Sequence, residues 1–207
     1  MMAIDTPERL IPIFDFGGVL LDWSPEYLFA KVIPNPEERK WFLSTVCPPE
    51  WNLRMDAGLS YAEAVAERVA LFPDQEARIR VWVQRWDDMI ARQFDGTARI
   101  VEALAETGPI YGLTNFGSES FARTKPRFPV LDRFTDILVS GDVGMVKPDP
   151  AIYRAAVQRF GVDPKACFYV DDKDYNLVIP KEMGMQVHQF SDPASLKAWL
   201  QGLGQLP

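Results

Sequence analysis

Reactive side chains stand in this sequence directly after short apolar runs. Asp15 follows LIPIF, Thr114-Asn115 follows PIYGL, Asp171-Asp172 follows ACFYV, and Lys147 lies in GDVGMVKPDP after DILVS. A carboxylate can attack as a nucleophile or hold a hard divalent cation, and a lysine can offset the negative charge around it. Brought together, these residue types suit nucleophilic attack by a carboxylate with help from a metal ion.

The elements that carry these residues alternate between strand and helix patterns. Apolar runs at 10–16, 109–114, 136–140, 166–171 and 186–190 predict strands, and helices are expected from near Thr97, Ser118, Pro150 and Lys173 and after Asp192-Pro193. This alternation predicts an α/β fold with a doubly wound parallel sheet and helices on both faces. The carboxyl ends of such strands are neighbours, so we expect the reactive residues to share one cleft.

Three carboxylates in one cleft need compensating positive charge. Each close pair would repel by roughly 4 kcal/mol at an effective dielectric constant near 20. Lys147 supplies one positive charge, and a hard divalent ion would supply the rest. Because Mg²⁺ prefers one or two carboxylates together with carbonyl oxygens, waters and substrate phosphate, we predict Mg²⁺ as the cofactor.

A segment without predicted strands, residues 24–93, interrupts the alternation. Ser24-Pro25 predicts a helix start, Ser60 and Glu63 form a capping box, and an amphipathic helical pattern follows Asp74. We predict a core domain at 1–23 and 94–207 and a helical cap domain at 24–93. The aromatic stripe of this segment is expected to form the cap's own core.

Four motifs in this order resemble those of the haloacid dehalogenase-like (HAD) hydrolase superfamily. They are DFGGV, LTN, the lysine of GMVKPDPAIY, and VDD followed by Asn176 and Gly184. The resemblance runs from residue 10 to about 190. It implies a Rossmann-like HAD core with a C1-type cap (subfamily I), and the first motif is similar to the members with Asp-x-Gly-Asn/Gly-Val, which are associated with sugar-phosphate-like substrates.

The resemblance also implies roles for individual residues in a phosphomonoester hydrolase acting on a small phosphorylated metabolite. Asp15 would be the nucleophile that forms an aspartyl-phosphate, and Lys147 would offset the charge of Asp15 and the phosphoryl group. Thr114, Asn115 and Gly18 would contact the substrate phosphate.

The metal ligands and the specificity residues follow from the same resemblance. Asp15, the backbone carbonyl of Gly17 and Asp172 would bind Mg²⁺ directly, and Asp171 would be their outer or water-bridged partner. Trp51, Arg54 and Asp56 are expected in a loop of the cap, where the substrate would be selected.

Each of these residues also has a simpler structural interpretation. Thr114 and Asn115 could cap the following helix, and Lys147 could be a solvated loop residue. Asp171-Asp172 could complement the dipole of a helix N-terminus, and Arg54 could form a surface ion pair. The functional interpretation is favoured because four such accidents would have to coincide at four strand ends.

One position departs from the family pattern. Phosphatases of this superfamily usually carry a second Asp two residues after the nucleophile as a general acid and base, but this sequence has Gly17 there. Losing such a group can cost roughly 10² to 10⁴ in rate, and Asp22 is a possible replacement. The departure keeps two alternatives open: a 2-haloacid dehalogenase, which needs no metal, and a HAD-like binding protein without turnover.

Composition limits the remaining function classes. The 207 residues are 47% apolar and 12% aromatic with a formal net charge of -7, and Lys and Arg are not clustered as nucleic-acid binding would require. No run reaches the roughly 18 apolar residues of a membrane span, and MMAIDTPERL lacks the features of a signal peptide. We expect a cytoplasmic monomer or homodimer without nucleic-acid or membrane partners, and no metal or redox pairing of Cys47 with Cys167.

Overall fold

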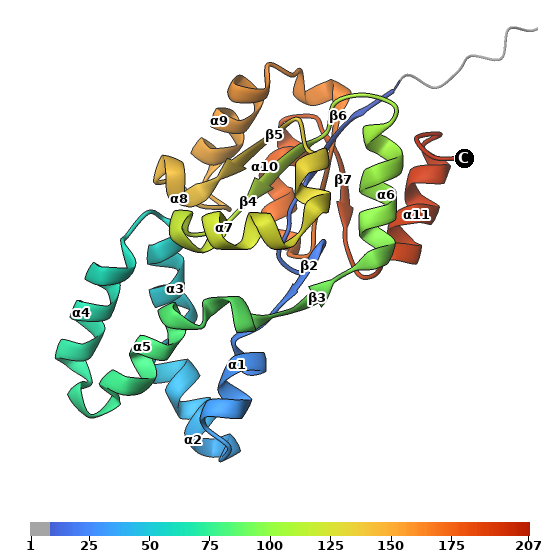
Figure 1. Cartoon of the computed structure of the whole chain (residues 1–207). Coiled ribbons are helices and arrows are strands. Elements are labelled where there is room, and N and C mark those ends of the chain that lie inside the picture. The colour runs from blue at the N-terminus through green and yellow to red at the C-terminus, as the bar shows by residue number, and fades with distance from the viewer. Residues whose placement is uncertain (1–8) are drawn as a thin grey trace, which may run out of the picture.

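A parallel sheet of five strands forms the centre of the fold in the computed structural model, which describes residues 9–207 (Figure 1). The first eight residues of the predicted segment 1–23 lie outside the described part. The strand order is β5-β4-β1-β6-β7, and every neighbouring pair is parallel. The strands are β1 (Ile11–Phe14), β4 (Tyr111–Thr114), β5 (Asp136–Val139), β6 (Cys167–Asp171) and β7 (Gln186–Gln189). The predicted α/β class is confirmed.

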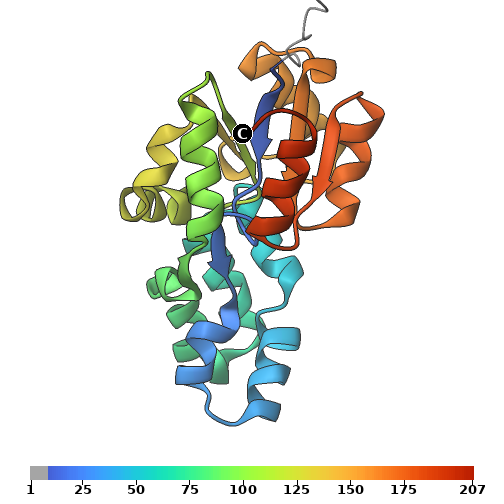
Figure 2. The same ribbon diagram turned by 90° about the vertical axis from the view of Figure 1, so that its right-hand side faces the viewer.

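Side chains alternate between the two faces of this sheet, and each face is covered by helices. Phe14, Phe168 and Val170 pack with residues of α6 (Asp95–Ala105) and α11 (Pro193–Gly202). Ile13 and Tyr169, one position along in each strand, pack instead with residues of α9 (Pro150–Phe160) and α10 (Val178–Glu182). Figure 2 shows α6 and α11 side by side on one face. Burial on both sides explains why these strands are almost continuously apolar.

Helix boundaries follow the capping residues of the sequence. The side chains of Asp149 and Asp192 accept hydrogen bonds from the first turns of α9 and α11, and a proline follows each aspartate. At the other end of α9, Gly161 adopts the left-handed conformation with φ 65°. Two shorter helices, α7 (Ser118–Thr124) and α8 (Ser140–Val143), follow β4 and β5.

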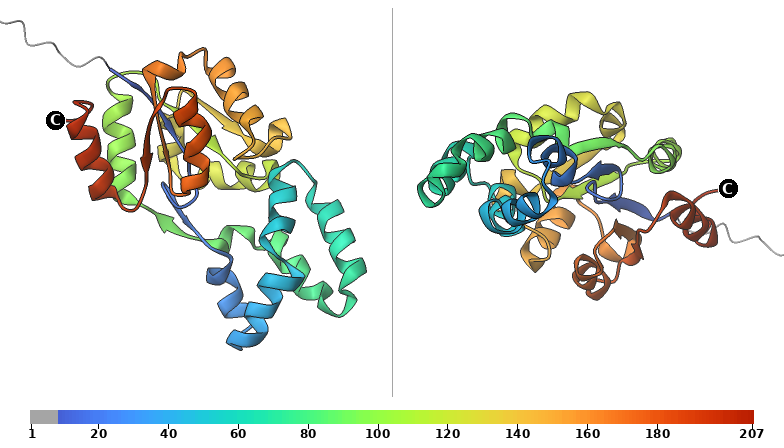
Figure 3. Two further views of the ribbon diagram at one scale, coloured as in Figure 1. Left: turned by 180° about the vertical axis from the view of Figure 1, so that it is seen from behind. Right: turned by 90° about the horizontal axis from the view of Figure 1, so that it is seen from below.

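A group of helices, here called the helical segment, lies between β2 (Leu21–Trp23) and β3 (Ile90–Gln93). It contains α1 (Pro25–Val32), α2 (Pro36–Trp41), α3 (Pro49–Asp56), α4 (Tyr61–Leu71) and α5 (Glu76–Gln84). Figure 3 shows these helices at the end of the sheet toward which β1 runs. The capping box of Ser60 and Glu63 is present at the start of α4.

Two expectations for this segment are wrong. Residues 24–93 do contain a strand, because β3 pairs antiparallel with β2 in a ribbon that joins the helical segment to the sheet. The sequence IARQ does not indicate a strand, because only Ile90 is buried and apolar residues do not alternate with polar ones. Trp51, Arg54 and Asp56 also do not lie in a loop, because Pro49 starts the helix α3 that carries all three.

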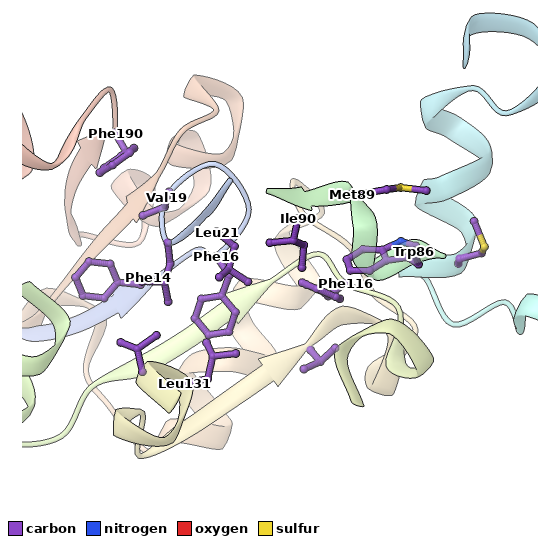
Figure 4. Packing of buried hydrophobic residues seen from close by; sticks show 14 of the residues in the cluster. Phe14, Phe16, Val19, Leu21, Trp86, Met89, Ile90, Phe116, Leu131 and Phe190 are labelled. Atoms are coloured by element: carbon purple, nitrogen blue, oxygen red, sulfur yellow. The ribbon is translucent and has the colours of Figure 1, made fainter. Parts of the chain in front are cut away.

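The aromatic stripe forms the core of the helical segment, as the helical spacing predicts. Trp82 packs against Phe29 and Trp51, with ring centroids 5.6 and 5.4 Å apart. Trp86 differs, because its ring lies 4.9 Å from that of Phe116, which follows β4 (Figure 4). Among residues 9–207, no helix is both long enough and apolar enough to cross a bilayer.

Candidate active site

Three carboxylates and a lysine meet where β1 and β6 end. Asp15 directly follows β1, and Asp171 is the last residue of β6, whose Val170 is in register with Phe14. Oxygens of Asp15, Asp171 and Asp172 lie within 4.8 Å of one another. The ammonium group of Lys147 lies 2.9 Å from Asp15 Oδ1 and 2.7 Å from Asp171 Oδ2. The parallel register therefore brings the reactive residues together, as the sequence predicts.

Asp171 is fully buried and saturated with donors. Besides Lys147, its oxygens accept hydrogen bonds from Tyr169 Oη (2.7 Å), from the Lys173 backbone (2.9 Å) and from Asn176 Nδ2 (3.0 and 3.1 Å). Burial alone would raise the pKa of Asp171, but attraction to Lys147 and these hydrogen bonds outweigh it and hold the pKa below its usual value. Asp171 is thus a fixed negative charge that positions Lys147.

Asp15 keeps one oxygen free. Lys147 and the backbone N–H of Phe16 both donate to Oδ1, and Oδ2 accepts no hydrogen bond from residues 9–207. Burial raises the pKa of Asp15 to about 7; the charge of Lys147 opposes this shift and that of Asp171 adds to it. A cation beside Asp15 would restore the carboxylate form, which is the nucleophilic one.

Gly18 leaves room for Asp172. Its backbone has φ +73°, and a Cβ atom at this position would lie 2.6 Å from Asp172 Oδ2. The Gly18 N–H donates to the Leu21 carbonyl at 2.9 Å, so Gly18 offers space at the site and its own donor is already used. Asp172 is partly exposed, and among residues 9–207 its ion-pair partner is the half-exposed Lys173, at 2.8 Å. Its carboxylate is therefore accessible to an incoming ion.

Thr114 and Asn115 have different surroundings although they are adjacent at the end of β4. The Thr114 hydroxyl is buried and has no hydrogen-bond partner within the described chain, and Thr114 lines neither of the two cavities at this site. The Asn115 amide instead donates to the Lys147 carbonyl at 3.0 Å and accepts from the Lys147 N–H at 2.8 Å. Asn115 positions the loop that carries Lys147.

Two adjoining cavities lie at this end of the sheet, and the larger one opens over the cluster. The larger, of about 330 Å³, is lined by residues that include Asp15, Gly18, Lys147 and Asp172. The smaller, of about 70 Å³, is mostly apolar, and its lining includes Trp86, Ile90 and Phe116, which Figure 4 shows near the β2–β3 ribbon. Gly17, Trp23, Asp56 and Asn115 line both cavities.

Three of the residues considered from the sequence are not brought to this cluster. Trp51 is buried within the helical segment, where its Nε1 donates to the Ala64 carbonyl. Arg54 forms an exposed ion pair with Glu67. Asp22 of β2 accepts hydrogen bonds from Tyr27 of α1 and Arg92 of β3, and it lines neither cavity.

For two residues of the site, the sequence predicted no catalytic or positioning role. Tyr169 donates to Asp171, and strand periodicity could have indicated it, because residues two apart in a strand share a face. Asp56 lines both cavities, but it comes from α3 in the helical segment. No sequence spacing relates a residue of an inserted helix to the strand ends.

Comparisons with known proteins agree with this arrangement. The family model "Haloacid dehalogenase-like hydrolase" matches residues 12–190. A phosphoglycolate phosphatase of Xanthomonas campestris is 27% identical over 180 residues, covering 84% of this chain and 79% of that protein. The (S)-2-haloacid dehalogenase 4A of Burkholderia cepacia is 29% identical over 85 residues, covering 41% of this chain and 37% of that protein.

A solved structure shares the fold. The magnesium complex of a HAD family enzyme from Bacteroides thetaiotaomicron superposes with a TM-score of 0.71 at 22% identity, covering 89% of this chain and 94% of that one. The family match includes β4, β6, all of β1 except Ile11, and the four residues of the cluster, Asp15, Lys147, Asp171 and Asp172. The chain belongs to the haloacid dehalogenase-like hydrolases.

Proposed function

We propose that this protein is a Mg²⁺-dependent phosphomonoester hydrolase that acts on a small phosphorylated metabolite, such as a sugar phosphate, through an aspartyl-phosphate on Asp15. The observation that carries the proposal is the convergence of Asp15, Lys147 and Asp172 on one cavity. The names of relatives such as the phosphoglycolate phosphatase of Xanthomonas campestris support hydrolysis of a phosphate ester.

The charges of the cluster fit a divalent cation. Asp15, Asp171 and Asp172 contribute three negative charges, and Lys147 and Lys173 contribute two positive charges, which leaves -1. A divalent ion would turn this into +1, which attracts a phosphate anion. The oxygen of Asp15 that does not attack phosphorus, Asp172 and the Gly17 carbonyl would hold the ion. When bound, Mg²⁺ would offset negative charge on the phosphoryl oxygens.

The residues of the chain then have defined tasks. One carboxylate oxygen of Asp15 attacks phosphorus, the bond to the ester oxygen breaks, and water later cleaves the aspartyl-phosphate. Lys147 stabilises the charge of Asp15 and of the transferring group, and Asn115 and Asp171 hold Lys147 in place. The unpartnered Thr114 hydroxyl would donate to a phosphate oxygen.

The cavity also limits the charge and size of the substrate. Its two lysines, Lys147 and Lys173, are both paired with carboxylates, so a second anionic group would meet no unpaired cation among the lining residues that the structure describes. The adjoining recess at Trp86 and Phe116 is small and mostly apolar. We infer that the remainder of the substrate is small and uncharged.

Dehalogenation of 2-haloacids is the second candidate, because a haloacid dehalogenase matches 41% of the chain. A 2-haloacid carries a carboxylate, which Asp172 and Asp171 would repel unless a metal ion neutralised them. A HAD-like binding protein without turnover is the third candidate function.

One set of measurements separates the three functions. Phosphate release is measured over a panel of phosphomonoesters with Mg²⁺ and with EDTA, and halide release is measured from 2-haloacids. We expect Mg²⁺-dependent phosphate release, with uncharged sugar or polyol esters preferred over phosphoglycolate. Halide release without metal would favour dehalogenation. Binding of beryllofluoride with Mg²⁺ but no product from any substrate would indicate a binding protein.

The nucleophile is tested by Asp15→Asn with Asp22→Asn as the matched control. Asp15→Asn should abolish phosphate release while the circular dichroism spectrum is unchanged, and Asp22→Asn should retain activity because Asp22 lines neither cavity. Unchanged phosphate release in the Asp15 variant would refute its role.

A further inference from the structure

Open space lies over Gly17, at the position where related phosphatases carry their acid–base aspartate. A Cβ atom built on Gly17 meets no heavy atom within 4 Å, and Gly17 is not among the glycines with positive φ. The residue lines both cavities beside Asp15. The structure therefore has space for an acidic side chain at position 17, although the residue there is glycine.

A carboxyl group from the helical segment faces the same space. Asp56, the last residue of α3, lines both cavities, and it is the one acid that does so among residues 9–207. Its Oδ2 accepts a hydrogen bond from Asn52 at 2.9 Å, and its carboxylate also accepts one from the backbone N–H of Gly117. Asp56 has no ion-pair partner in the described chain.

The end of α3 is held in place by contacts with residues that follow β4 and β5. The hydroxyl of Ser140 donates to the Asp56 carbonyl at 2.6 Å while accepting from the Phe116 N–H at 2.8 Å. Gly58 lies against the backbone of Gly141 so closely that a Cβ there would be 3.1 Å from its carbonyl oxygen. These contacts hold the Asp56 carboxyl at the rim of the strand ends.

The surroundings of Asp56 also suit proton transfer. Burial raises its pKa to about 7, although the hydrogen bond from Gly117 lowers it. A group with this pKa exchanges protons efficiently near neutral pH.

We propose that Asp56 is the acid–base catalyst of this site and takes the place of the carboxyl group that Gly17 lacks. This inference rests on the proposed function. In the first step, the acid form of Asp56 donates its proton to the ester oxygen while the P–O bond to that oxygen breaks and the bond to Asp15 forms. In the second step, the Asp56 carboxylate takes a proton from water as the water oxygen attacks phosphorus and Asp15 leaves. Phosphate is released and Asp56 is again an acid.

The test compares esters whose leaving groups need different amounts of help. Phenolate is a poor leaving group, and 2,4-dinitrophenolate leaves without protonation. For Asp56→Asn we expect kcat/KM with phenyl phosphate to fall by about 10² or more, and with 2,4-dinitrophenyl phosphate by less than about tenfold. Because kcat/KM covers only the steps up to phosphoryl transfer, the later hydrolysis does not enter the comparison.

A merely structural role for Asp56 would lower kcat/KM for both esters equally, and that result, or no loss for either, would overturn the inference. Asp22→Asn is the matched control and should leave both values unchanged. Asp56→Glu keeps the carboxyl group but moves it by one methylene. Its loss of kcat/KM should again be confined to phenyl phosphate, and this variant provides the test if Asp56→Asn does not fold. The proposed function fails separately, if the wild-type protein releases phosphate from neither ester.

Discussion

The side chain of Asn115 and the backbone of Lys147 are joined by two hydrogen bonds, one in each direction, of 2.8 and 3.0 Å. The two residues are 32 positions apart in the sequence. Their pairing closes the loop after β5 onto the end of β4, and it places the Lys147 ammonium group between Asp15 and Asp171. An amide, with one donor and one acceptor, is the group that can satisfy both backbone positions at once.

Asn115→Ala should therefore impair catalysis through the position of Lys147. We expect kcat to fall by about tenfold to a hundredfold, since small displacements of a catalytic group are costly. The free energy of unfolding should fall by about 1–3 kcal/mol because two hydrogen bonds are lost. Steady-state kinetics and urea unfolding provide the measurements. Asn35→Ala, which removes the N-cap of α2, is the control: it should affect stability alone. Full activity in the Asn115 variant would contradict the positioning role.

Lys147→Met should destabilise the fold as well as stop turnover. Lys147 is 3% exposed, and without it two buried carboxylates would face each other without a cation. Breaking such a buried pair costs about 3–5 kcal/mol. The free energy of unfolding, measured in urea without divalent ions, should fall by this amount.

The half-exposed Lys173 provides the control for that experiment. Lys173→Met should cost less than about 1 kcal/mol, because exposed ion pairs contribute little. Adding Asp171→Asn to the Lys147 variant should recover part of the loss, since one buried charge is removed. Equal stability of the two lysine variants would show that the buried network is not important for folding.

Gly18→Ala should weaken metal binding. The added methyl group would lie 2.6 Å from Asp172 Oδ2 in a backbone conformation with φ +73°, so either Asp172 or the loop must move. We expect at least a tenfold loss of Mg²⁺ affinity, measured by calorimetry and by the rise in Tm on adding Mg²⁺. Gly202→Ala, whose Cβ would meet nothing within 4 Å, should bind Mg²⁺ as the wild type does. An unchanged affinity for Mg²⁺ in Gly18→Ala would mean that Asp172 is not a ligand.

The sheet and the strand-end cluster could be predicted from the sequence because both depend on local patterns. Parallel strands buried on both faces give short apolar runs, and the side chains that follow those runs must meet at one edge. Strand β3 could not be predicted because it is stabilised by pairing with β2, from which the helical segment separates it in the sequence. In addition, only one of its four residues is buried.

The contribution of the helical segment could not be predicted, because it depends on contacts between elements far apart in the sequence. Arg54 and Asp56 are two positions apart on α3, yet Arg54 faces Glu67 on α4 and Asp56 faces Gly117 and Asn52 at the cavity. The orientation of α3 decides which of the two reaches the site. Ser140, 84 residues away from Asp56, fixes that orientation.

Gly17→Asp should restore catalysis to a protein that lacks Asp56. The Cβ of the new side chain would meet no atom within 4 Å, so the substitution should be accommodated without displacing the cluster. In the Asp56→Asn background, we expect kcat/KM for phenyl phosphate to rise by at least about tenfold, because a carboxyl group again lies beside the leaving oxygen. Gly17→Asn in the same background adds similar volume but no acid, and it should give no gain. If both substitutions act alike, the open space over Gly17 is not the place from which the leaving group is protonated.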